Sequence, residues 1–250
     1  MWRFIDFTVT NPYLNMAYEE VFLHTVGQGA SVPVLRFWQN WNTVVIGYFQ
    51  KLEQEVDVSE CKALYTQVVR RLSGGGAVYH DWGNLNYAIF LPNNYPGLPD
   101  DLTESYRWLS MGIVKGLEAL GLKAEFAPLN DLLIGGKKVS GVAQTRRYGA
   151  ILHHGTLLLN TNLEYLTRTL RVMHSKLSKH NLDSIRQRVT NLKDLGVNLS
   201  LAEIKQVLIK GFNDWFKVEI IKSPVTPLEH RLARNLFFEK YNSREWNYKR

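Results

Sequence analysis

Three consecutive glycines, Gly74 to Gly76, constrain this 250-residue chain more than any other feature. They follow a strand-like run over Gln67 to Leu72 and precede an alternating, strand-like run over Asn84 to Leu91. Without Cβ atoms, backbone N–H groups can approach a ligand closely and point together at an anion. Arg71 adds a positive charge suited to a phosphate or a carboxylate. The spacing matches neither a Walker loop nor a dinucleotide-binding fingerprint, and a tight structural hairpin stays open as an alternative.

The remaining patterns predict an α+β fold. Apolar residues at helical spacing predict helices that begin near Asn11-Pro12 and Asp101. Two capping-box patterns, Ser200-x-x-Glu203 and Thr226-Pro227-x-Glu229, predict two more helices near the C-terminus, and Gly135-Gly136 predicts a hairpin. Strands mostly meet through hairpins rather than through strict strand–helix alternation. We therefore expect a mainly antiparallel sheet flanked by helices, with the helices packed on one side.

Composition limits the class of protein. The single cysteine, Cys61, excludes an intramolecular disulfide framework and a thiolate zinc cage. No apolar run approaches the ~20 residues that span a bilayer, and Asp6, Asn11 and Asn15 interrupt any signal-like run, so we expect a cytoplasmic protein without membrane contact. The net charge is +7, and residues 131–250 hold 21 Lys+Arg against 10 Asp+Glu. That excess suits an anionic substrate, an acidic protein or nucleic acid, or simply a solvated basic surface.

Two further clusters contain residues suited to chemistry. Asp131 precedes the glycine hairpin and Lys138 follows it, so paired strands would bring both side chains beside one ligand. A carboxylate there suits Mg²⁺ or an adenine amino group, and a lysine suits a developing negative charge. His153 and His154 are adjacent in a strand-like run. Because neighbours on a strand point to opposite faces, at most one of them enters a given site.

Four segments together resemble the lipoate–protein ligase A family, in the superfamily that also contains biotin–protein ligases and octanoyltransferases. They are RRLSGGGAVYHDWGNLNY, NDLLIGGKKVSGVAQ, HHGTLLLNTNLEYL and SIRQRVTNL, in the order of the family. The resemblance extends from NPYLNMAYEE to YNSREWN. It implies the biotin/lipoate-ligase type of catalytic domain, distantly related to class II aminoacyl-tRNA synthetase cores. It assigns this domain to residues 1–195, with residues 196–250 as a short C-terminal helical extension of the same domain.

The resemblance implies an ATP-dependent ligase that forms an acyl-adenylate. ATP would be the co-substrate with Mg²⁺ as the metal, and lipoate or octanoate would be the substrate, without a tightly bound prosthetic group. The family's motifs place lipoate at Arg71, Ser73, His80, Lys138 and His154, with Lys138 as the catalytic residue. They place ATP or the adenylate at Gly74, Gly75, Gly76, Ala77, Val78, Asn84, Asn130, Asp131 and Lys138, with Asp131 as the magnesium ligand.

The implied partners are acidic acceptor lipoyl domains, in acyltransferase subunits of 2-oxoacid dehydrogenases, in the glycine cleavage H protein or in similar proteins. Basic residues beyond the motifs would steer such an acceptor: Arg171, Lys176, Lys179, Arg186, Arg188 and Lys193. Binding to nucleic acid is disfavoured, because Arg146-Arg147-Tyr148 is the only short stretch that combines basic and aromatic residues.

An octanoyltransferase is the nearest alternative. The similar octanoyltransferases carry the acyl group on a cysteine between the triple glycine and the lysine hairpin, where this chain has residues 126–131, FAPLND. Cys61 lies before the triple glycine and suits a small core residue, so we disfavour this function. Biotin ligation is also disfavoured, because all four motifs are of the lipoate type. Many family members carry an extra C-terminal domain, so a ligase half that needs a separate accessory subunit for adenylation stays open.

Overall fold

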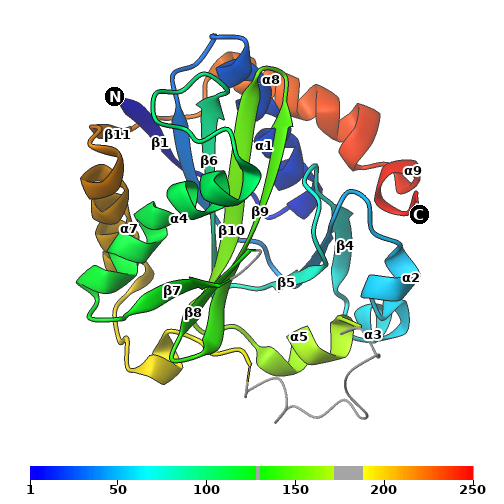
Figure 1. Cartoon of the computed structure of the whole chain (residues 1–250). Helices are drawn as coiled ribbons and strands as arrows, with labels where there is room; N and C mark the ends of the chain where they lie inside the picture. Colours follow the sequence, from blue (N-terminus) through cyan, green and yellow to red (C-terminus); the bar gives the residue numbers. More distant parts are fainter. Residues whose placement is uncertain (128–129, 172–187, 250) are drawn as a thin grey trace.

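A large sheet of eight strands runs through the computed structural model, which describes residues 1–127, 130–171 and 188–249 (Figure 1). The strand order is β11–β1–β2–β6–β10–β9–β8–β7. Pairs from β2 to β7 are antiparallel, whereas β1 pairs in parallel with β2 and β11, so the mainly antiparallel sheet is confirmed. The strands are β1 (Trp2–Asp6), β2 (Val34–Trp38), β6 (Asn84–Pro92), β7 (Ala124–Ala127), β8 (Asp131–Ile134), β9 (Lys137–Arg147), β10 (Ala150–Leu158) and β11 (Ile220–Lys222).

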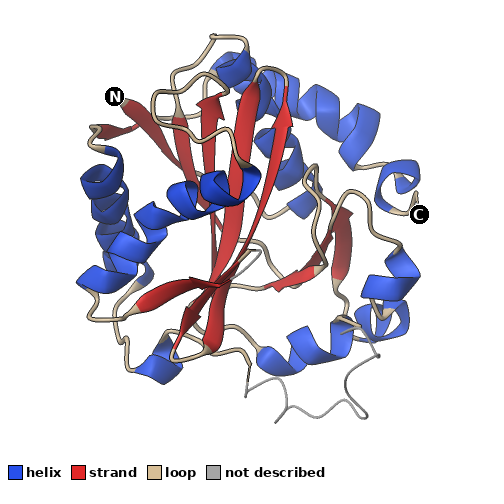
Figure 2. Ribbon diagram, viewed as in Figure 1, coloured by secondary structure: helices blue, strands red, loops and turns tan. Residues whose placement is uncertain are grey.

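Helices cover both faces of this sheet (Figure 2). α1 (Pro12–Gly27) and α8 (Pro227–Leu236) pack on one face, and α4 (Leu102–Ala119) and α7 (Leu201–Phe216) pack on the other. The expectation of helices on one side is therefore wrong. Strand β6 gives the physical reason, because eight of its nine residues are buried. Side chains on both faces of this central strand need an apolar cover.

The starts of four helices and the hairpin between β8 and β9 follow the sequence patterns. The side chains of Asn11 and Asp101 cap α1 and α4 by accepting backbone N–H bonds. Both predicted capping boxes are present, at the starts of α7 and α8. Gly135 and Gly136 have φ values of +56° and +78° and form the two-residue turn between β8 and β9. Within the described ranges, no helix is long and apolar enough to cross a membrane.

A smaller sheet with the order β4–β3–β5 lies beside the large one. Its strands are β3 (Thr43–Ile46), β4 (Gln67–Arg70) and β5 (Val78–His80), and α2 (Leu52–Glu55), α3 (Val58–Ala63) and α5 (Leu163–Thr169) pack around a core cluster of their own. Residues 71–77, here called the glycine loop, connect β4 to β5. Because β3 lies between these two strands, the glycine loop spans a third strand and is not a tight hairpin.

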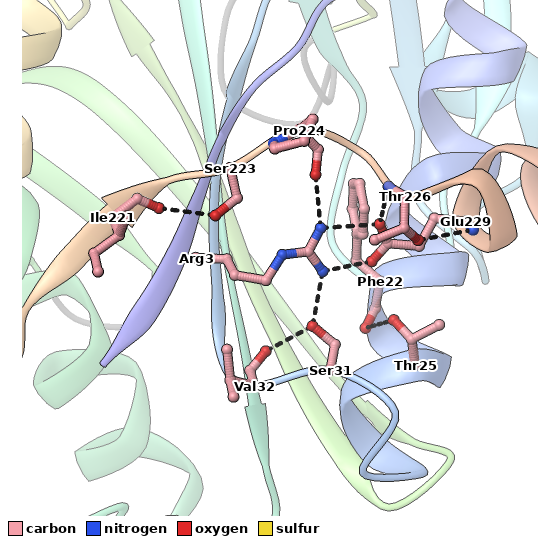
Figure 3. Close-up of polar contacts among 10 residues, drawn as sticks. All are labelled: Arg3, Phe22, Thr25, Ser31, Val32, Ile221, Ser223, Pro224, Thr226 and Glu229. Carbon is pink, nitrogen blue, oxygen red and sulfur yellow. Dashed lines mark hydrogen bonds and ion pairs between the residues drawn. The ribbon is translucent and has the colours of Figure 1, made fainter.

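Arg3 on β1 fixes the segment that follows β11 (Figure 3). Its guanidinium donates to both carboxylate oxygens of Glu229, at 2.7 and 3.0 Å, and to the carbonyl of Pro224 at 2.9 Å. It also donates to the hydroxyl of Ser31 at 2.9 Å. Burial raises the pKa of Glu229, but the bonds from Arg3 and from the backbone of Thr226 outweigh it and hold the pKa below its ordinary value. The start of α8 is thereby anchored to β1.

Candidate active site

A pocket lies between α1, the glycine loop and the sheet face that α1 covers. A row of residues that pair across neighbouring strands runs along that face: Trp38 with Asn86, Asn86 with Thr156, Thr156 with Gly141, and Gly141 with Asp131. The cavity volume is about 120 Å³. The predicted site residues that line it are Arg71, Gly76, Ala77, Val78, His80, Asn130, Lys138 and His154.

Arg71 organises the glycine loop from inside. Its buried guanidinium donates to Ser73 Oγ at 3.0 Å and to the carbonyls of Val45, Gly74 and Gly76 at 3.0, 2.6 and 2.9 Å. These bonds use four of the five N–H groups of a guanidinium. Burial lowers the pKa of Arg71 to about 10, so the group stays cationic at neutral pH. Most of its hydrogen-bonding capacity therefore serves the loop, while its charge lies at the pocket wall.

The glycine loop presses against neighbouring backbone. Gly75 has a φ of +87°, which favours glycine, and a Cβ on Gly47 would lie 1.8 Å from the Gly75 carbonyl oxygen. The N–H of Ala77 donates to Glu55 Oε2 at 2.9 Å, and Gln50 Nε2 donates to Glu55 Oε1 at 2.6 Å. A carboxylate of this chain thus occupies one N–H of the loop predicted to bind an anion. Sequence reasoning missed Glu55.

A chain of hydrogen bonds connects the loop to α1. Ser73 Oγ lies 2.6 Å from His154 Nε2, and His154 Nδ1 lies 2.6 Å from Glu19 Oε1. All three side chains are buried, and Ser73 contacts the pocket through His154 and Arg71 rather than lining it. Sequence reasoning missed Glu19. The available signal was its spacing from Met16, since residues three apart on a helix share a face and both line the pocket.

His80 belongs to a second buried network. Asn40 Nδ2 lies 3.0 Å from His80 Nδ1, and His80 Nε2 lies 2.8 Å from Thr156 Oγ1, which donates to Asn86 Oδ1 at 2.9 Å. This arrangement assigns the His80 proton to Nε2, because the amide of Asn40 donates to Nδ1. Burial and the charge of Arg71 lower the pKa of His80 to about 3. His80 is therefore a neutral wall of the pocket, and Asn86 and Thr156 were not predicted.

The two adjacent histidines point to opposite faces of β10, as predicted. His154 faces the pocket, whereas His153 lies among residues on the other side of the sheet, 3.3 Å from Ser110 Oγ and 3.1 Å from Gln144 Nε2. Burial lowers the pKa of His153 to about 3. His153 therefore belongs to the core beneath α4 and not to the pocket.

Lys138 and Asp131 form an ion pair at the other side of the pocket, with Nζ 2.7 Å from Oδ1. Their side chains are about a third exposed, at 35% and 32%. The lysine lies directly over Gly141, where a Cβ would be 2.8 Å from Nζ. The backbone of Lys138 also bonds to the carbonyl of Arg188 and to the N–H of Thr190, at 2.7 and 3.0 Å. Both residues belong to the segment SIRQRVTNL, which therefore fixes the backbone of Lys138 by hydrogen bonds. Residues 184–187 of this segment lie outside the described residues.

Five predicted residues lie around the pocket rather than in its lining: Ser73, Asp131, Asn84, Gly74 and Gly75. Asn84 caps the turn between β5 and β6, where its Oδ1 accepts the N–H of Asp81 at 2.6 Å. Gly74 faces the ring of Phe49 on the outer side of the loop, and Gly75 lies against Gly47. Within the described ranges, no group of three or more His, Cys, Asp and Glu side chains is arranged to hold a metal ion.

Known proteins match this chain over most of its length. The model of the lipoyl protein ligase A/B catalytic domain matches residues 11–213. Lipoate-protein ligase A subunit 1 of Thermoplasma acidophilum is 36% identical over 96% of this chain and 93% of that protein. Octanoyltransferase LipM of Carboxydothermus hydrogenoformans is also 36% identical, over 98% of this chain and 97% of that protein.

A solved structure of an archaeal lipoylation system, described as a bi-partite lipoate protein ligase and its E2 lipoyl domain from Thermoplasma acidophilum, has the same fold. It gives a TM-score of 0.89 at 35% identity and covers 98% of this chain and 95% of that chain. The extent of these matches leads to one conclusion. This chain belongs to the lipoyl protein ligase A/B family of enzymes and has the catalytic-domain fold of lipoate–protein ligases.

Proposed function

We propose that this protein is an ATP-dependent lipoate–protein ligase, which activates lipoate as lipoyl-AMP and transfers the lipoyl group to a lysine of an acceptor lipoyl domain. The observation that carries the proposal is the Lys138–Asp131 pair, a partly exposed cation beside a carboxylate at the edge of the pocket. Such a pair suits a reaction between two anions, a carboxylate and a nucleoside triphosphate. The family itself is shown by the comparisons, and the choice of a ligase within it is our inference.

In the first half-reaction, a carboxylate oxygen of lipoate attacks the α-phosphorus of ATP, and the bond to pyrophosphate breaks. Negative charge grows on the α-phosphoryl oxygens as the two anions meet. A preorganised ammonium group at that point lowers the barrier. Lys138 would supply it, and the absence of a side chain on Gly141, which leaves room for its amine, supports this role. Gly76, Ala77, Val78 and Asn130 line the same pocket and would contact the nucleotide.

Asp131 fits the role of a magnesium ligand. Mg²⁺ is usually bound by one or two carboxylates together with the phosphates of a substrate, so a single, partly exposed carboxylate is sufficient. When bound, the ion would neutralise phosphate charge during the transfer. Asp131 would exchange its partner Lys138 for the ion, and the lysine would be released toward the reacting oxygens.

Apolar residues form the rest of the pocket wall and suit the hydrocarbon part of lipoate or octanoate. They are Met16, Trp38, Val45, Val142 and Ala143. The network of His80, Thr156 and Asn86 is neutral, although the amide nitrogen of Asn86 has no hydrogen-bond partner among the described residues. A neutral wall can lie beside an apolar chain at lower cost than a charged one. His154 and Arg71, which is bonded to Ser73, close the wall next to the glycine loop.

In the second half-reaction, the amine of the acceptor lysine attacks the carbonyl carbon of the mixed anhydride. An amide bond forms, the bond to AMP breaks, and the amine loses a proton. No nucleophile of the enzyme is needed. Cys61, the single cysteine of the chain, is buried in the core of the small sheet, and burial, with Asp57 and Glu60 nearby, raises the pKa of its thiol to about 12. A thiol in that state is a poor acyl carrier.

Octanoyltransferase activity is the second candidate, because the similarity to LipM is as high as that to the ligase subunit. The two functions separate in one assay. The protein is incubated with an apo lipoyl domain and either ATP, Mg²⁺ and lipoate, or an octanoyl thioester donor without ATP. The ligase, with an accessory subunit added if it is required, predicts acceptor modification and pyrophosphate in the first mixture. Modification in the second mixture, with an acyl group on Cys61, would contradict the proposal.

We further infer that an accessory subunit contributes to adenylation, since the similar Thermoplasma acidophilum enzyme is described as bi-partite. This chain by itself would then transfer the lipoyl group from preformed lipoyl-AMP but activate free lipoate poorly. Purified chain is given lipoyl-AMP in one reaction and lipoate with ATP in another. Equal rates of acceptor modification in both, without a second subunit, would contradict this inference.

A further inference from the structure

Outside the pocket, cations and aromatic rings form one connected surface, here called the basic–aromatic patch. The ring of Tyr48 lies beneath Arg147, with 4.7 Å from Cζ to the ring centroid, and beneath Lys249, with 3.6 Å from Nζ. Trp246 lies beneath Lys240 and Lys249, at 4.1 and 3.9 Å. The two rings are neighbours, with centroids 5.6 Å apart. The patch comprises Tyr48, Phe49, Arg147, Lys240, Trp246 and Lys249.

This patch is attached to the outer side of the glycine loop, whose inner side lines the pocket. The N–H of Tyr48 donates to the carbonyl of Ser73 at 2.8 Å, and the ring of Phe49 lies 3.6 Å from the position of a Cβ on Gly74. The indole of Trp246 donates to the carbonyl of Arg70, the last residue of β4, at 2.9 Å. Figure 1 shows α9 (Arg244–Asn247) and the C-terminus beside β4, from which the loop begins.

The electrostatics of the patch favour a negatively charged partner. Arg147 and Lys249 both lower the pKa of the Tyr48 phenol, Arg147 by hydrogen bonding and Lys249 by its charge, so negative charge is favourable at this point. Glu20 neutralises Lys240 at 2.6 Å, whereas Arg147 forms no ion pair with a carboxylate anywhere in the described part of the chain. The positive charge of Arg147 therefore stays available to a partner.

The side chains also fit a protein rather than a nucleic acid. Arg, Tyr, Trp and Phe are the residues enriched at protein interfaces, and Phe49 is 58% exposed. Single-stranded nucleic acid would need bare aromatic faces for base stacking. Here the faces of Tyr48 and Trp246 are covered by cations, which can still meet carboxylates at their outer side.

We propose that the basic–aromatic patch is the docking surface for an acidic face of the acceptor lipoyl domain, which brings the acceptor lysine over the glycine loop to the pocket. This inference rests on the proposed function and deepens it, because it assigns the partner to a surface made by the turn after β3, the end of β9 and the C-terminal residues. Half of the basic cluster expected from the sequence lies outside the described residues. Lys176, Lys179 and Arg186 do so, whereas Arg171, Arg188 and Lys193 are described.

The test compares two double charge reversals of equal net charge. Arg147→Glu/Lys249→Glu changes the patch, and Lys115→Glu/Lys123→Glu changes α4 and the residues just after it. The dissociation constant of an apo E2 lipoyl domain is measured by calorimetry, and adenylate formation is measured separately by pyrophosphate release. We expect the patch variant to bind the domain at least about tenfold more weakly, the control to bind like the wild type, and both to form adenylate at the wild-type rate.

Thermal unfolding shows whether each variant is folded, and Arg147→Gln/Lys249→Gln replaces the reversal if it is not, with a smaller loss of affinity expected. Equal affinity of the patch variant and the control would overturn the proposal. So would a patch variant that keeps its affinity but loses adenylate formation, or a wild type that binds a 20-nucleotide single strand through the patch more tightly than the lipoyl domain. If the wild type forms no adenylate even with an accessory subunit added, the proposed function fails, while the binding comparison still decides the docking surface.

Discussion

The two sides of the pocket are built in opposite ways. On the glycine-loop side, Arg71, Ser73, His154 and Glu19 are buried and bonded to one another or to backbone carbonyls. On the hairpin side, Lys138 and Asp131 are about a third exposed and share one ion pair. A saturated buried network fixes a shape, whereas an exposed pair can change partners at little cost. We therefore infer that the first side fixes the shape of the glycine loop and that the second side supplies the charges that take part in the reaction.

The largest expected effect is on the hairpin side. Lys138→Ala removes the ammonium group from the pocket while its backbone bonds to residues 188 and 190 remain. We expect adenylate formation to fall about 100- to 1000-fold, the usual loss for one preorganised charge-stabilising group, with little change in the unfolding temperature. Pyrophosphate release and a thermal scan measure the two quantities. A near-normal rate would show that the reacting cation is a different residue.

Arg71→Ala should, in contrast to Lys138→Ala, lower the stability of the protein. The carbonyls of Val45, Gly74 and Gly76 would lose their buried donor, so the free energy of unfolding should fall by about 3 kcal/mol. Urea unfolding measures this change. Arg71→Lys should not restore stability, because a lysine cannot form the forked set of bonds. If Arg71→Ala leaves stability unchanged, the loop does not depend on this network.

Two buried histidines, His80 at the pocket wall and His153 on the other face of the sheet, should make the stability of the protein depend on pH. Burial lowers the pKa of His80 and His153 to about 3 in the folded protein, against about 6.5 in an unfolded chain. Below pH ~6.5 the unfolded chain binds protons that the folded protein does not, so stability falls with decreasing pH, by about 1.4 kcal/mol per unit for each histidine. Urea midpoints at pH 7, 6 and 5 test this. His153→Gln should halve the histidine part of the slope, and an unchanged slope would contradict the assignment.

The smallest effect is expected for Gly141→Ala, a variant that tests the positioning of Lys138. A Cβ at Gly141 would lie 2.8 Å from Nζ and 2.9 Å from Cε of Lys138, so Gly141→Ala must move the end of a flexible side chain. We expect adenylate formation to slow roughly tenfold while stability changes by less than about 1 kcal/mol. Rate and unfolding are measured on one preparation. A large loss of stability would place Gly141 in the rigid side of the pocket instead.

Local patterns were sufficient to predict much of the fold. The starts of α1, α4, α7 and α8 and the turn at Gly135-Gly136 follow from capping residues, helical spacing and glycine pairs. The position of β3 between β4 and β5, the parallel pairing of β1 and the helices on both faces did not follow. These features depend on contacts between distant parts of the chain, which no local pattern records.

Local patterns also predicted only part of the candidate site. The glycine loop, Lys138 and His154 are in recognisable motifs, and the structure brings them to one pocket. Glu19 and Glu55 were missed because each is an ordinary acidic residue in a helix until the fold places it against His154 or the N–H of Ala77. Asn86 and Thr156 were missed because alternation with apolar residues suggests a solvent-facing side chain, whereas here both strand faces are buried.

The central claim is that the acyl group is activated as an adenylate and not on the enzyme. Lipoate labelled with ¹⁸O in its carboxylate tests this most directly, in a reaction with ATP, Mg²⁺, an apo lipoyl domain and, if required, an accessory subunit. Because the carboxylate attacks the α-phosphorus, the AMP released on transfer should carry one ¹⁸O atom, and intact-mass spectra should show no acylated enzyme. Unlabelled AMP, or an acylated enzyme formed without consumption of ATP, would contradict the account.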